Sequence, residues 1–302
     1  VFGTLKAAFY ALLFALPLAI MGAIYTAYFM PDHIRAWVKP GIEVMAALPT
    51  VILGFIGGLW LAPIVEQELA SVLSAFIMVP CALVACALFW SIVPSSTRDR
   101  IAGGYALLVV PAIIAAIAIG FHIGPWFEAA WFGGDSRTWL REVAGLDYAQ
   151  RNALVVGMVM GLAVIPPIFS IAEDAIHGVP QHLVNGSLAL GATPWQTLSQ
   201  VVLLTAAPGI FSAVMVGVGR AVGETMIVLM ATGNTPIMDF NVFEGMRTFA
   251  ANIAVELPET EVNSSHYRIL FLTAFVLFMI TFFFNTIAEI VRERLRSHYG
   301  NL

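Results

Sequence analysis

Long apolar stretches separated by short polar segments dominate the pattern of residues along this chain. A helix needs about 20 mostly apolar residues to cross the roughly 30 Å hydrocarbon core of a bilayer. Both faces of these stretches are apolar, so their length rather than their periodicity identifies them as spans. The stretches that qualify are Leu5–Tyr28, Ile42–Leu61, Leu69–Val93, Gly103–Phe121, Ala153–Ile171, Ala206–Ala231 and Ile269–Val291. The pattern therefore predicts an all-α fold, a polytopic transmembrane helical bundle of about seven spans.

Prolines fall within several of the predicted spans. Pro17, Pro49 and the pair Pro166 and Pro167 are expected to interrupt helical hydrogen bonding. At membrane depth such breaks are tolerated where neighbouring helices or a water-lined cavity satisfy the backbone. We therefore expect one of these two surroundings at each proline.

The composition excludes an ordinary water-soluble fold. Apolar residues make up 60% of the 302 residues and charged residues 11%, with a mean hydropathy of +0.88. Soluble domains carry about a quarter charged residues. The formal net charge of −5 is small and scattered, so no basic face for nucleic acid is expected. Cys81 and Cys86 lie in one apolar run and are interpreted as packing residues.

Lysine and arginine in the short loops indicate the orientation in the membrane. The basic residues on the side assigned to the cytoplasm are Arg35, Lys39, Arg98, Arg100, Arg292, Arg294 and Arg296. The opposite side also carries arginines, but in longer loops that have less weight. The C-terminus is then cytoplasmic and Val1 lies outside, which predicts at least one helix upstream.

A moderately polar segment between the fifth and sixth predicted spans differs from its surroundings. It reads as a short helix, a turn at Gly191, and a second helix in which Thr193 is the N-cap and Pro194 the first residue. The residues alone fit equally well a simple hairpin that joins two spans. Their spacing resembles the EAA signature of ABC importer permeases: a triplet, three residues, Gly, nine residues, an aliphatic residue, any residue and Leu. The triplet here lacks its acidic residue, and Leu204 stands where the signature has Pro.

Other segments resemble the phosphate-specific, Pst-type permeases of this family. They include Glu43–Thr50, Ile171–Ile176 and Gly219–Met226. The resemblance covers most of the chain apart from about residues 65–150. It implies one permease domain of the type I ABC importer fold over residues 1–302, with an insertion at about 65–150 and a cytoplasmic coupling loop at about 173–205.

The resemblance also implies the partners. In this family the coupling loop contacts a cytoplasmic ATPase, and the residues that match it here are Asn185, Gly186, Ser187, Gly191, Ala192, Thr193 and Leu203. The sequence contains no Gly-x4-Gly-Lys-Ser/Thr phosphate cradle. ATP and Mg are therefore expected in the partner, and this chain is expected to be no enzyme and to hold no cofactor. A second permease subunit, two ATPase copies and a periplasmic phosphate-binding protein complete the implied complex, in contact with membrane lipid.

Two opposite charges fall near the middle of the predicted sixth span. Arg220 and Glu224 are four residues apart, which would place them on one helix face. An Arg at the bilayer centre costs about 3 kcal/mol on insertion scales, so it faces the protein interior or water. A guanidinium offers phosphate a planar fork of donors, and Glu224 is expected to hold Arg220 when the site is empty. The alternative is an ion pair that only fixes two helices.

Weaker candidates surround this pair. Thr225 is a possible hydrogen-bond donor along the pathway, although Thr in spans usually bonds its own helix. Glu43 near a helix end is explained by snorkelling or a loop contact, and Asn285 by a helix interface. The dispersed histidines predict no zinc site. In the Pst-type family, the Arg and Glu of the matching motif are associated with phosphate passage.

The leading hypothesis is a permease subunit of an ATP-driven importer that carries inorganic phosphate across a bacterial inner membrane. One alternative is import of another oxyanion, such as sulfate or molybdate, because a single Arg does not select among them. A second is a secondary carrier or channel that acts without ATP. A third is an added role in reporting phosphate status to a sensor kinase.

Overall fold

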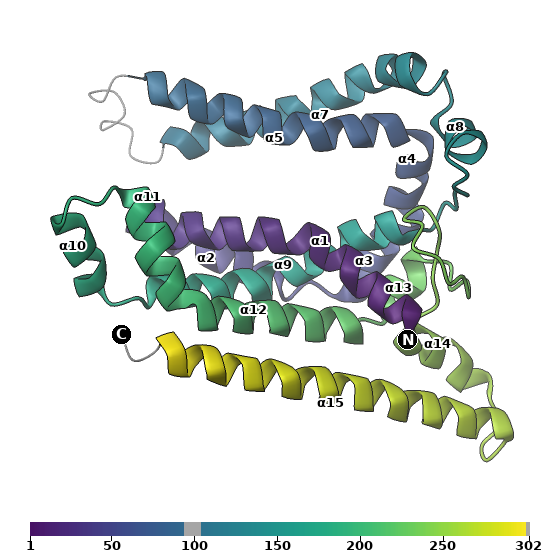
Figure 1. Cartoon of the computed structure of the whole chain (residues 1–302). Helices are drawn as coiled ribbons and strands as arrows, with labels where there is room; N and C mark the ends of the chain where they lie inside the picture. The colour runs from purple at the N-terminus through teal and green to yellow at the C-terminus, as the bar shows by residue number, and fades with distance from the viewer. Residues whose placement is uncertain (94–103, 300–302) are drawn as a thin grey trace. The chain divides into compact units, whose positions relative to one another are not determined.

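The computed structural model describes the backbone of residues 1–93 and 104–299, and the side chains of residues 1–93 and 108–294. Every regular element within these residues is a helix (Figure 1). In the described part of the chain, seven helices are long and apolar enough to cross a membrane: Phe2–Phe29, Thr50–Gln67, Leu69–Ile92, Leu108–Glu142, Ala153–His177, Pro194–Gly223 and Ser265–Arg294. The predicted all-α, seven-span architecture is confirmed.

The chain divides into two compact units. The larger comprises Val1–Leu59 and Arg151–Leu302, and the smaller Trp60–Gln150. The larger unit holds α1 (Phe2–Ile24), η1 (Tyr25–Phe29), α2 (Asp32–Met45), α3 (Thr50–Ile56), α9 (Ala153–His177), α10 (Gln181–Ala189), α11 (Pro194–Thr197), η3 (Leu198–Val202), α12 (Leu203–Gly223), α13 (Met226–Ala231), α14 (Phe249–Glu256), η4 (Leu257–Glu259) and α15 (Ser265–Tyr299). The smaller unit holds α4 (Ala62–Gln67), α5 (Leu69–Ile92), α7 (Gly104–Trp131) and α8 (Ser136–Glu142), and η2 (Gly57–Leu61) crosses the boundary.

Helices α1 and α9 form the core of the larger unit. A stripe of alanines at four-residue spacing lies along one face of α1 and is almost completely buried: Ala7, Ala11, Ala15, Ala19 and Ala23. Gly157 and Gly161 of α9 face this stripe, and a Cβ on either would lie within 3.1 Å of Phe14. Small residues at this spacing let two helix backbones approach closely in a membrane. Residues from α9 dominate the buried core, and α12 packs against both α9 and α1.

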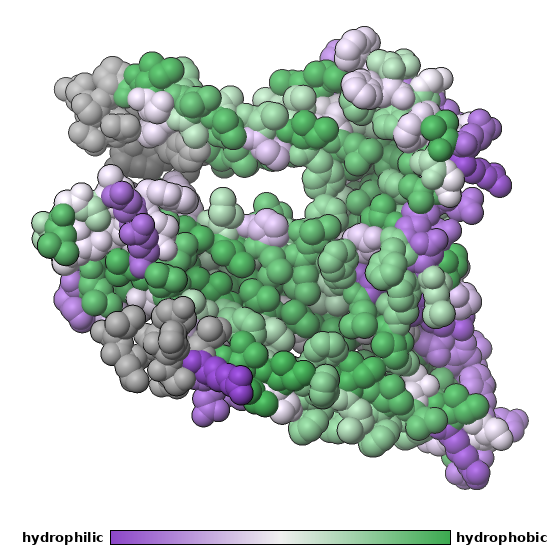
Figure 2. Space-filling view, viewed as in Figure 1, coloured by the Kyte–Doolittle hydropathy of each residue, from purple (hydrophilic) through white to green (hydrophobic). Residues whose placement is uncertain are grey.

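The long helix α15 runs beside α12 and is covered by little else. Its phenylalanines at positions 275, 278, 282 and 283 are 58%, 61%, 58% and 62% exposed. In the larger unit, hydrophobic residues cover the helix faces and hydrophilic residues gather toward the two ends (Figure 2). Exposed apolar side chains of this size are suited to lipid or to another membrane subunit.

In the smaller unit, α5 and α7 form an antiparallel hairpin. Gly120 packs against the backbone of Ala75, and Gly124 packs against Ser71. The buried hydroxyl of Ser74 donates to the carbonyl of Gly120 at 2.5 Å. At the end of this hairpin, Asp135 caps α8 by accepting from two backbone amides.

The prolines have different effects on the helices. Pro17 lies inside α1, and Pro166 and Pro167 lie inside α9, and both helices continue through them. Pro49 instead is the N-cap of α3, with an extended backbone conformation. The predicted second span, Ile42–Leu61, was therefore wrong at its start: Ile42 belongs to α2, and the span begins at Thr50.

Some of the basic residues used to predict the orientation lie in a helix, and others lie outside the described residues. Arg35 and Lys39 lie in helix α2 and not in a loop. Arg98, Arg100 and Gly103, and the side chain of Arg296, lie outside the described residues. Within the larger unit, α10, α11 and the end of α15 lie at one end, and the N-terminus with α13 and α14 lies at the other (Figure 1).

Candidate functional site

The predicted sixth span is broken at the residues expected to carry the chemistry. Helix α12 ends at Gly223, Glu224 has an extended conformation with ψ of 129°, and α13 begins at Met226. Arg220 lies in the last turn of α12. The expectation that Arg220 and Glu224 share one helix face was therefore wrong, because the helix does not continue from one to the other.

The carboxylate of Glu224 accepts hydrogen bonds from backbone amides that follow it in the chain. Its Oε1 accepts from the amides of Thr225 at 3.2 Å and Ile227 at 3.5 Å. Thr225, the N-cap of α13, donates its hydroxyl to the carbonyl of Gly223 at 3.3 Å. These contacts satisfy amides that a helix start leaves without an intrahelical partner. The predicted donor Thr225 thus bridges the break between the two helices.

Arg220 faces a groove of about 390 Å³ between α12 and α15. The groove is lined by Ser212, Met215, Val216, Gly219, Arg220, Asn285, Ala288, Glu289 and Arg292. Among the described residues Arg220 has no ion pair and no hydrogen bond, in contrast to the expected pairing with Glu224. The guanidinium is therefore available to a ligand in this groove.

Residues of α15 supply the opposite wall of the groove. Arg292 pairs with Glu289 one turn earlier, at 2.5 Å. The Oδ1 atom of Asn285 lies 3.7 Å from the position that a Cβ on Gly219 would occupy. Asn285 therefore lies at the interface of α12 and α15, as predicted, and it also lines the groove. A groove with two guanidinium groups, an amide and one paired carboxylate can attract an anion.

The part of the predicted coupling loop formed by α10, the turn at Gly191 and α11, here called the coupling segment, has the predicted helix–turn–helix form. Thr193 caps α11 in a capping box: its Oγ1 accepts from the amide of Gln196 at 3.2 Å, and the Gln196 side chain accepts from the amide of Thr193 at 2.8 Å. Pro194 is the first residue of α11. Gly191 has a φ of +90°, a left-handed conformation that favours glycine. The local predictions for this segment are confirmed.

The coupling segment presents apolar side chains to its surroundings. Leu190 is 92% exposed and Trp195 is 67% exposed, and α10 buries none of its residues. Asn185 and Gly186 lie on α10, and Ala192 follows the turn. Ser187 is held to Thr197 by a hydroxyl contact of 2.9 Å, which joins α10 to α11. Leu203 lies away from this tip, as the first residue of α12.

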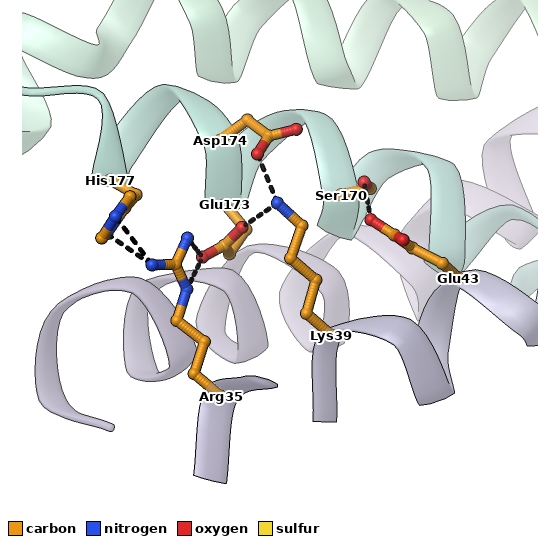
Figure 3. A network of polar contacts seen from close by, with 7 residues as sticks. All are labelled: Arg35, Lys39, Glu43, Ser170, Glu173, Asp174 and His177. Carbon is orange, nitrogen blue, oxygen red and sulfur yellow. Dashed lines mark hydrogen bonds and ion pairs between the residues drawn. The ribbon is translucent and has the colours of Figure 1, made fainter. Parts of the chain in front are cut away.

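A polar network joins α2 to the last turns of α9 (Figure 3). Glu173 is fully buried, yet two cations reach it from α2. Arg35 donates from Nε to Glu173 Oε1 at 2.6 Å, and its Nη2 lies 2.5 Å from the same oxygen. The Nζ of Lys39 lies 2.8 Å from Glu173 Oε2 and also pairs with Asp174. A buried carboxylate with two cationic partners is the arrangement that such a charge requires.

The same two helices make further contacts on either side of Glu173. Ser170 donates to Glu43 at 3.0 Å. The Nη1 of Arg35 lies 2.8 Å from Nδ1 and 2.7 Å from Nε2 of His177, so it lies over the imidazole ring. Burial works against the charge on Lys39, but hydrogen bonds and attraction from Asp174 and Glu173 outweigh it and raise the pKa of Lys39.

The sequence reasoning missed this network. It used Arg35 and Lys39 only to orient the chain, and it explained Glu43 by snorkelling or a loop contact. A signal was nevertheless present: positions 35, 39 and 43 recur at intervals of four, and positions 170, 173, 174 and 177 share one helix face. Two complementary polar faces in so apolar a chain indicate a contact between them.

Comparison with known proteins gives a consistent result. The family described as "Binding-protein-dependent transport system inner membrane component" matches residues 15–297. The "Probable ABC transporter permease protein YqgH" of Bacillus subtilis (strain 168) is 25% identical over 294 residues, which cover 97% of this chain and 71% of that protein. The "Phosphate transport system permease protein PstC" of Mesorhizobium japonicum is 26% identical over 300 residues, 99% of this chain and 74% of that protein. PstC of Xylella fastidiosa (strain 9a5c) is 26% identical over 301 residues, 100% and 75%. No solved structure matches.

Proposed function

Because the chain belongs to the family of binding-protein-dependent transport system inner membrane components, we propose that it is the permease subunit through which inorganic phosphate enters the cytoplasm. The phosphate transport names of several relatives support this substrate. The observation that carries the proposal is Arg220, a cation in the groove between α12 and α15 without an ion-pair partner among the described residues.

The chemistry of Arg220 suits an anion such as phosphate. A guanidinium within a membrane span is costly, so it is retained where it pairs with a charge or serves a pathway. Among the described residues no carboxylate pairs with Arg220, whereas Arg292 in the same groove is paired with Glu289. Phosphate presents several acceptor oxygens in the geometry that guanidinium donors match. We assign Arg220, Glu224 and Thr225 to the pathway, with Arg220 as the group that contacts the anion.

We further propose that the coupling segment contacts a cytoplasmic ATPase, which binds ATP and Mg and hydrolyses the nucleotide. The exposed apolar tip at Leu190 and Trp195 supports a protein partner at this position. The complete complex would hold a second permease subunit, two ATPase copies and a periplasmic phosphate-binding protein. With the coupling segment facing the cytoplasmic ATPase, the C-terminus also lies in the cytoplasm.

The domain organisation is part of the same proposal. We regard residues 1–302 as one permease domain with an insertion at about 65–150. The separate compact unit Trp60–Gln150, built on the α5–α7 hairpin, supports this division.

Uptake of radiolabelled phosphate into vesicles that contain the reconstituted complex tests the proposal. We expect uptake to require ATP, to resist excess sulfate, and to fall about tenfold or more in Arg220→Gln, because a hydrogen bond to a charged group contributes about 1.5–3 kcal/mol. Arg141→Gln is the matched control, because Arg141 pairs with Asp147 at the surface, where the two are 79% and 75% exposed.

Each contrary result has a distinct meaning. Strong competition by sulfate would replace phosphate with a broader class of oxyanions. Uptake that persists without the ATPase would identify a carrier or channel in place of an ATP-driven importer. Unchanged uptake in Arg220→Gln would remove Arg220 from the pathway.

A further inference from the structure

The polar network between α2 and α9 consists of two matched helix faces. On α2 the participants recur every four residues, at Arg35, Lys39 and Glu43. On α9 they occupy positions 170, 173, 174 and 177, which also lie on one side of a helix. Three successive turns of α2 therefore meet three successive turns of α9 through polar contacts (Figure 3).

Ionic contacts hold α2 to α9, while the apolar residues Ile34, Val38 and Ile42 of α2 are only partly buried. Helix α2 buries none of its residues, and Trp37 is 84% exposed. The side chains of Arg35 and Lys39 are 16% and 22% exposed, and Glu173 is fully buried. The ionic contacts of Arg35 and Lys39 therefore meet at Glu173, and Lys39 also pairs with the neighbouring Asp174. Because a buried charge is costly without its partners, Glu173 resists separation from α2.

The network lies at a mechanically important position in the chain. Helix α9 ends at His177, which contacts Arg35, and α10 of the coupling segment begins at Gln181. On the other side, α2 connects the first span, which ends at Phe29, to the second span, which begins at Thr50. Any displacement of the coupling segment is therefore applied to α9 next to the point where α2 is attached.

A second contact supports the same mechanical connection. The hydroxyl of Tyr28, at the end of the first span, donates to the carbonyl of Pro194 in α11 at 3.1 Å. The first span thus contacts the coupling segment directly through Tyr28 and indirectly through α2. The ion pairs between α2 and α9 maintain the indirect connection through α2, and the chain continues from α2 to α3.

We propose that Glu173, together with Arg35 and Lys39, forms an ionic clamp that makes α2 move with the coupling segment. Through the clamp, motion received at α10 and α11 passes to the ends of the first two spans as well as to α9. Glu173 is a positioning residue in this assignment, because it acts through α2 and does not contact the transported anion. The inference rests on the proposed function for the source of the motion, an ATPase at the coupling segment.

Removing the clamp without leaving a buried charge gives the sharpest test. The triple variant Arg35→Gln, Lys39→Gln and Glu173→Gln neutralises all three groups at once, so it avoids the folding cost of a single unpaired charge. In the reconstituted complex, ATP hydrolysis and phosphate uptake are measured together. We expect the phosphate transported per ATP hydrolysed to fall about tenfold, the size typical of coupling between two sites, while the subunits still copurify.

The phosphate transported per ATP hydrolysed also defines the control and the result that would contradict the clamp. Arg141→Gln removes an exposed ion pair of the smaller unit and should leave phosphate per ATP unchanged. A triple variant that assembles and retains the wild-type ratio would overturn the clamp. A parallel loss of hydrolysis and uptake, with the ratio preserved, would also overturn it, because it indicates a role in assembly alone.

A measurement that does not depend on the transported solute separates this inference from the proposed function. Spin labels are placed at the exposed positions in Trp37→Cys and His182→Cys, the second in α10 and outside the residues assigned to the ATPase contact, with Cys81 and Cys86 replaced by Ser and Ala. The distance between the labels is measured in the complex with and without a nonhydrolysable ATP analogue. We expect one unchanged distance in the clamped protein, and a distance that shifts or broadens with nucleotide in the triple variant. The same response in both proteins would overturn the clamp even if phosphate is the substrate.

Discussion

Two arginines in the larger unit have opposite surroundings. Arg35 contacts a fully buried carboxylate and the ring of a histidine, and it is held by α9 at several points. Arg220 lines a groove between α12 and α15 and has no ion pair among the described residues. Both are cations in a chain with 11% charged residues. One positive charge is neutralised within the protein, and the other remains available.

Under the proposed function, the contrast separates a structural charge from a transport charge. Where a charge joins two helices, a partner of opposite sign is built into the fold, and removing that partner destabilises the protein. Where a charge serves a passing anion, an internal partner of equal strength would compete with the anion. Glu224, the expected competitor, instead accepts from the backbone amides that begin α13. The structure thus explains how two nearby charges of opposite sign avoid neutralising each other.

The largest expected effect is on stability. Replacing both Arg35 and Lys39 with Gln leaves Glu173 buried without a cation, which should cost about 3–5 kcal/mol. Thermal unfolding in lipid nanodiscs measures this loss. Arg220→Gln should change stability by no more than about 0.5 kcal/mol, because it breaks no hydrogen bond or ion pair within the described residues. An equal loss of stability in both variants would remove the distinction between the two arginines.

The next effect concerns the geometry of Arg220. Arg220→Lys retains the positive charge but loses the planar fork of donors, so phosphate uptake should fall about tenfold while melting temperature is unchanged. Vesicle uptake at limiting phosphate measures the change. Uptake at the wild-type level would mean that the groove provides only a positive potential, without directed hydrogen bonds.

A smaller effect distinguishes the two roles of Glu224. Glu224→Ala removes the acceptor for the amides of Thr225 and Ile227, and should cost about 1 kcal/mol, as the loss of a helix cap does. Glu224→Gln retains an acceptor oxygen and should preserve stability. A fall in uptake common to both variants would identify the negative charge as part of the pathway. Normal uptake in Glu224→Gln would restrict Glu224 to the backbone break.

The smallest effect is a pH dependence of the clamp. The pKa of Lys39 is raised above its ordinary value of 10.5, because Asp174 and Glu173 outweigh the effect of burial. A raised pKa means that Lys39 contributes its full stability below pH 10.5 and loses that contribution as the pH rises through the folded-state pKa. The difference in melting temperature between wild type and Lys39→Met should therefore be constant near neutral pH and shrink above 10.5. A difference that already shrinks between about pH 7 and 10 would contradict the assignment.

Local features of the fold could be predicted from the sequence because they depend on neighbouring residues. Span length follows from apolar runs, and the N-cap at Thr193, with Pro194 after it, is confirmed from a short stretch of chain. The left-handed turn at Gly191 is another local feature. These predictions held because a few residues determine them.

The pairing of distant residues could not be predicted in the same way. Glu173 meets Arg35 across 138 positions, and only the packing of α2 on α9 brings them together. The break at Glu224 also escaped prediction, since Ala206–Ala231 is apolar enough to read as one continuous span. Next to this break, Gly54 packs against the backbone of Met226, a tertiary contact that the local sequence does not specify. The assignment of Arg220 to phosphate stays a prediction.

The residue at position 191 is subject to two constraints: this chain limits its backbone conformation, and a docking partner can limit the size of its side chain. Its φ of +90° is in the left-handed region, yet a Cβ there would meet no atom of the described residues within 4 Å. The backbone conformation at Gly191 therefore disfavours an L side chain because of its chirality, whereas the neighbouring described residues do not limit its size. L-alanine at this position would strain the backbone, although its methyl group would find room. Any limit on the size of a side chain here must come from whatever molecule docks against the turn.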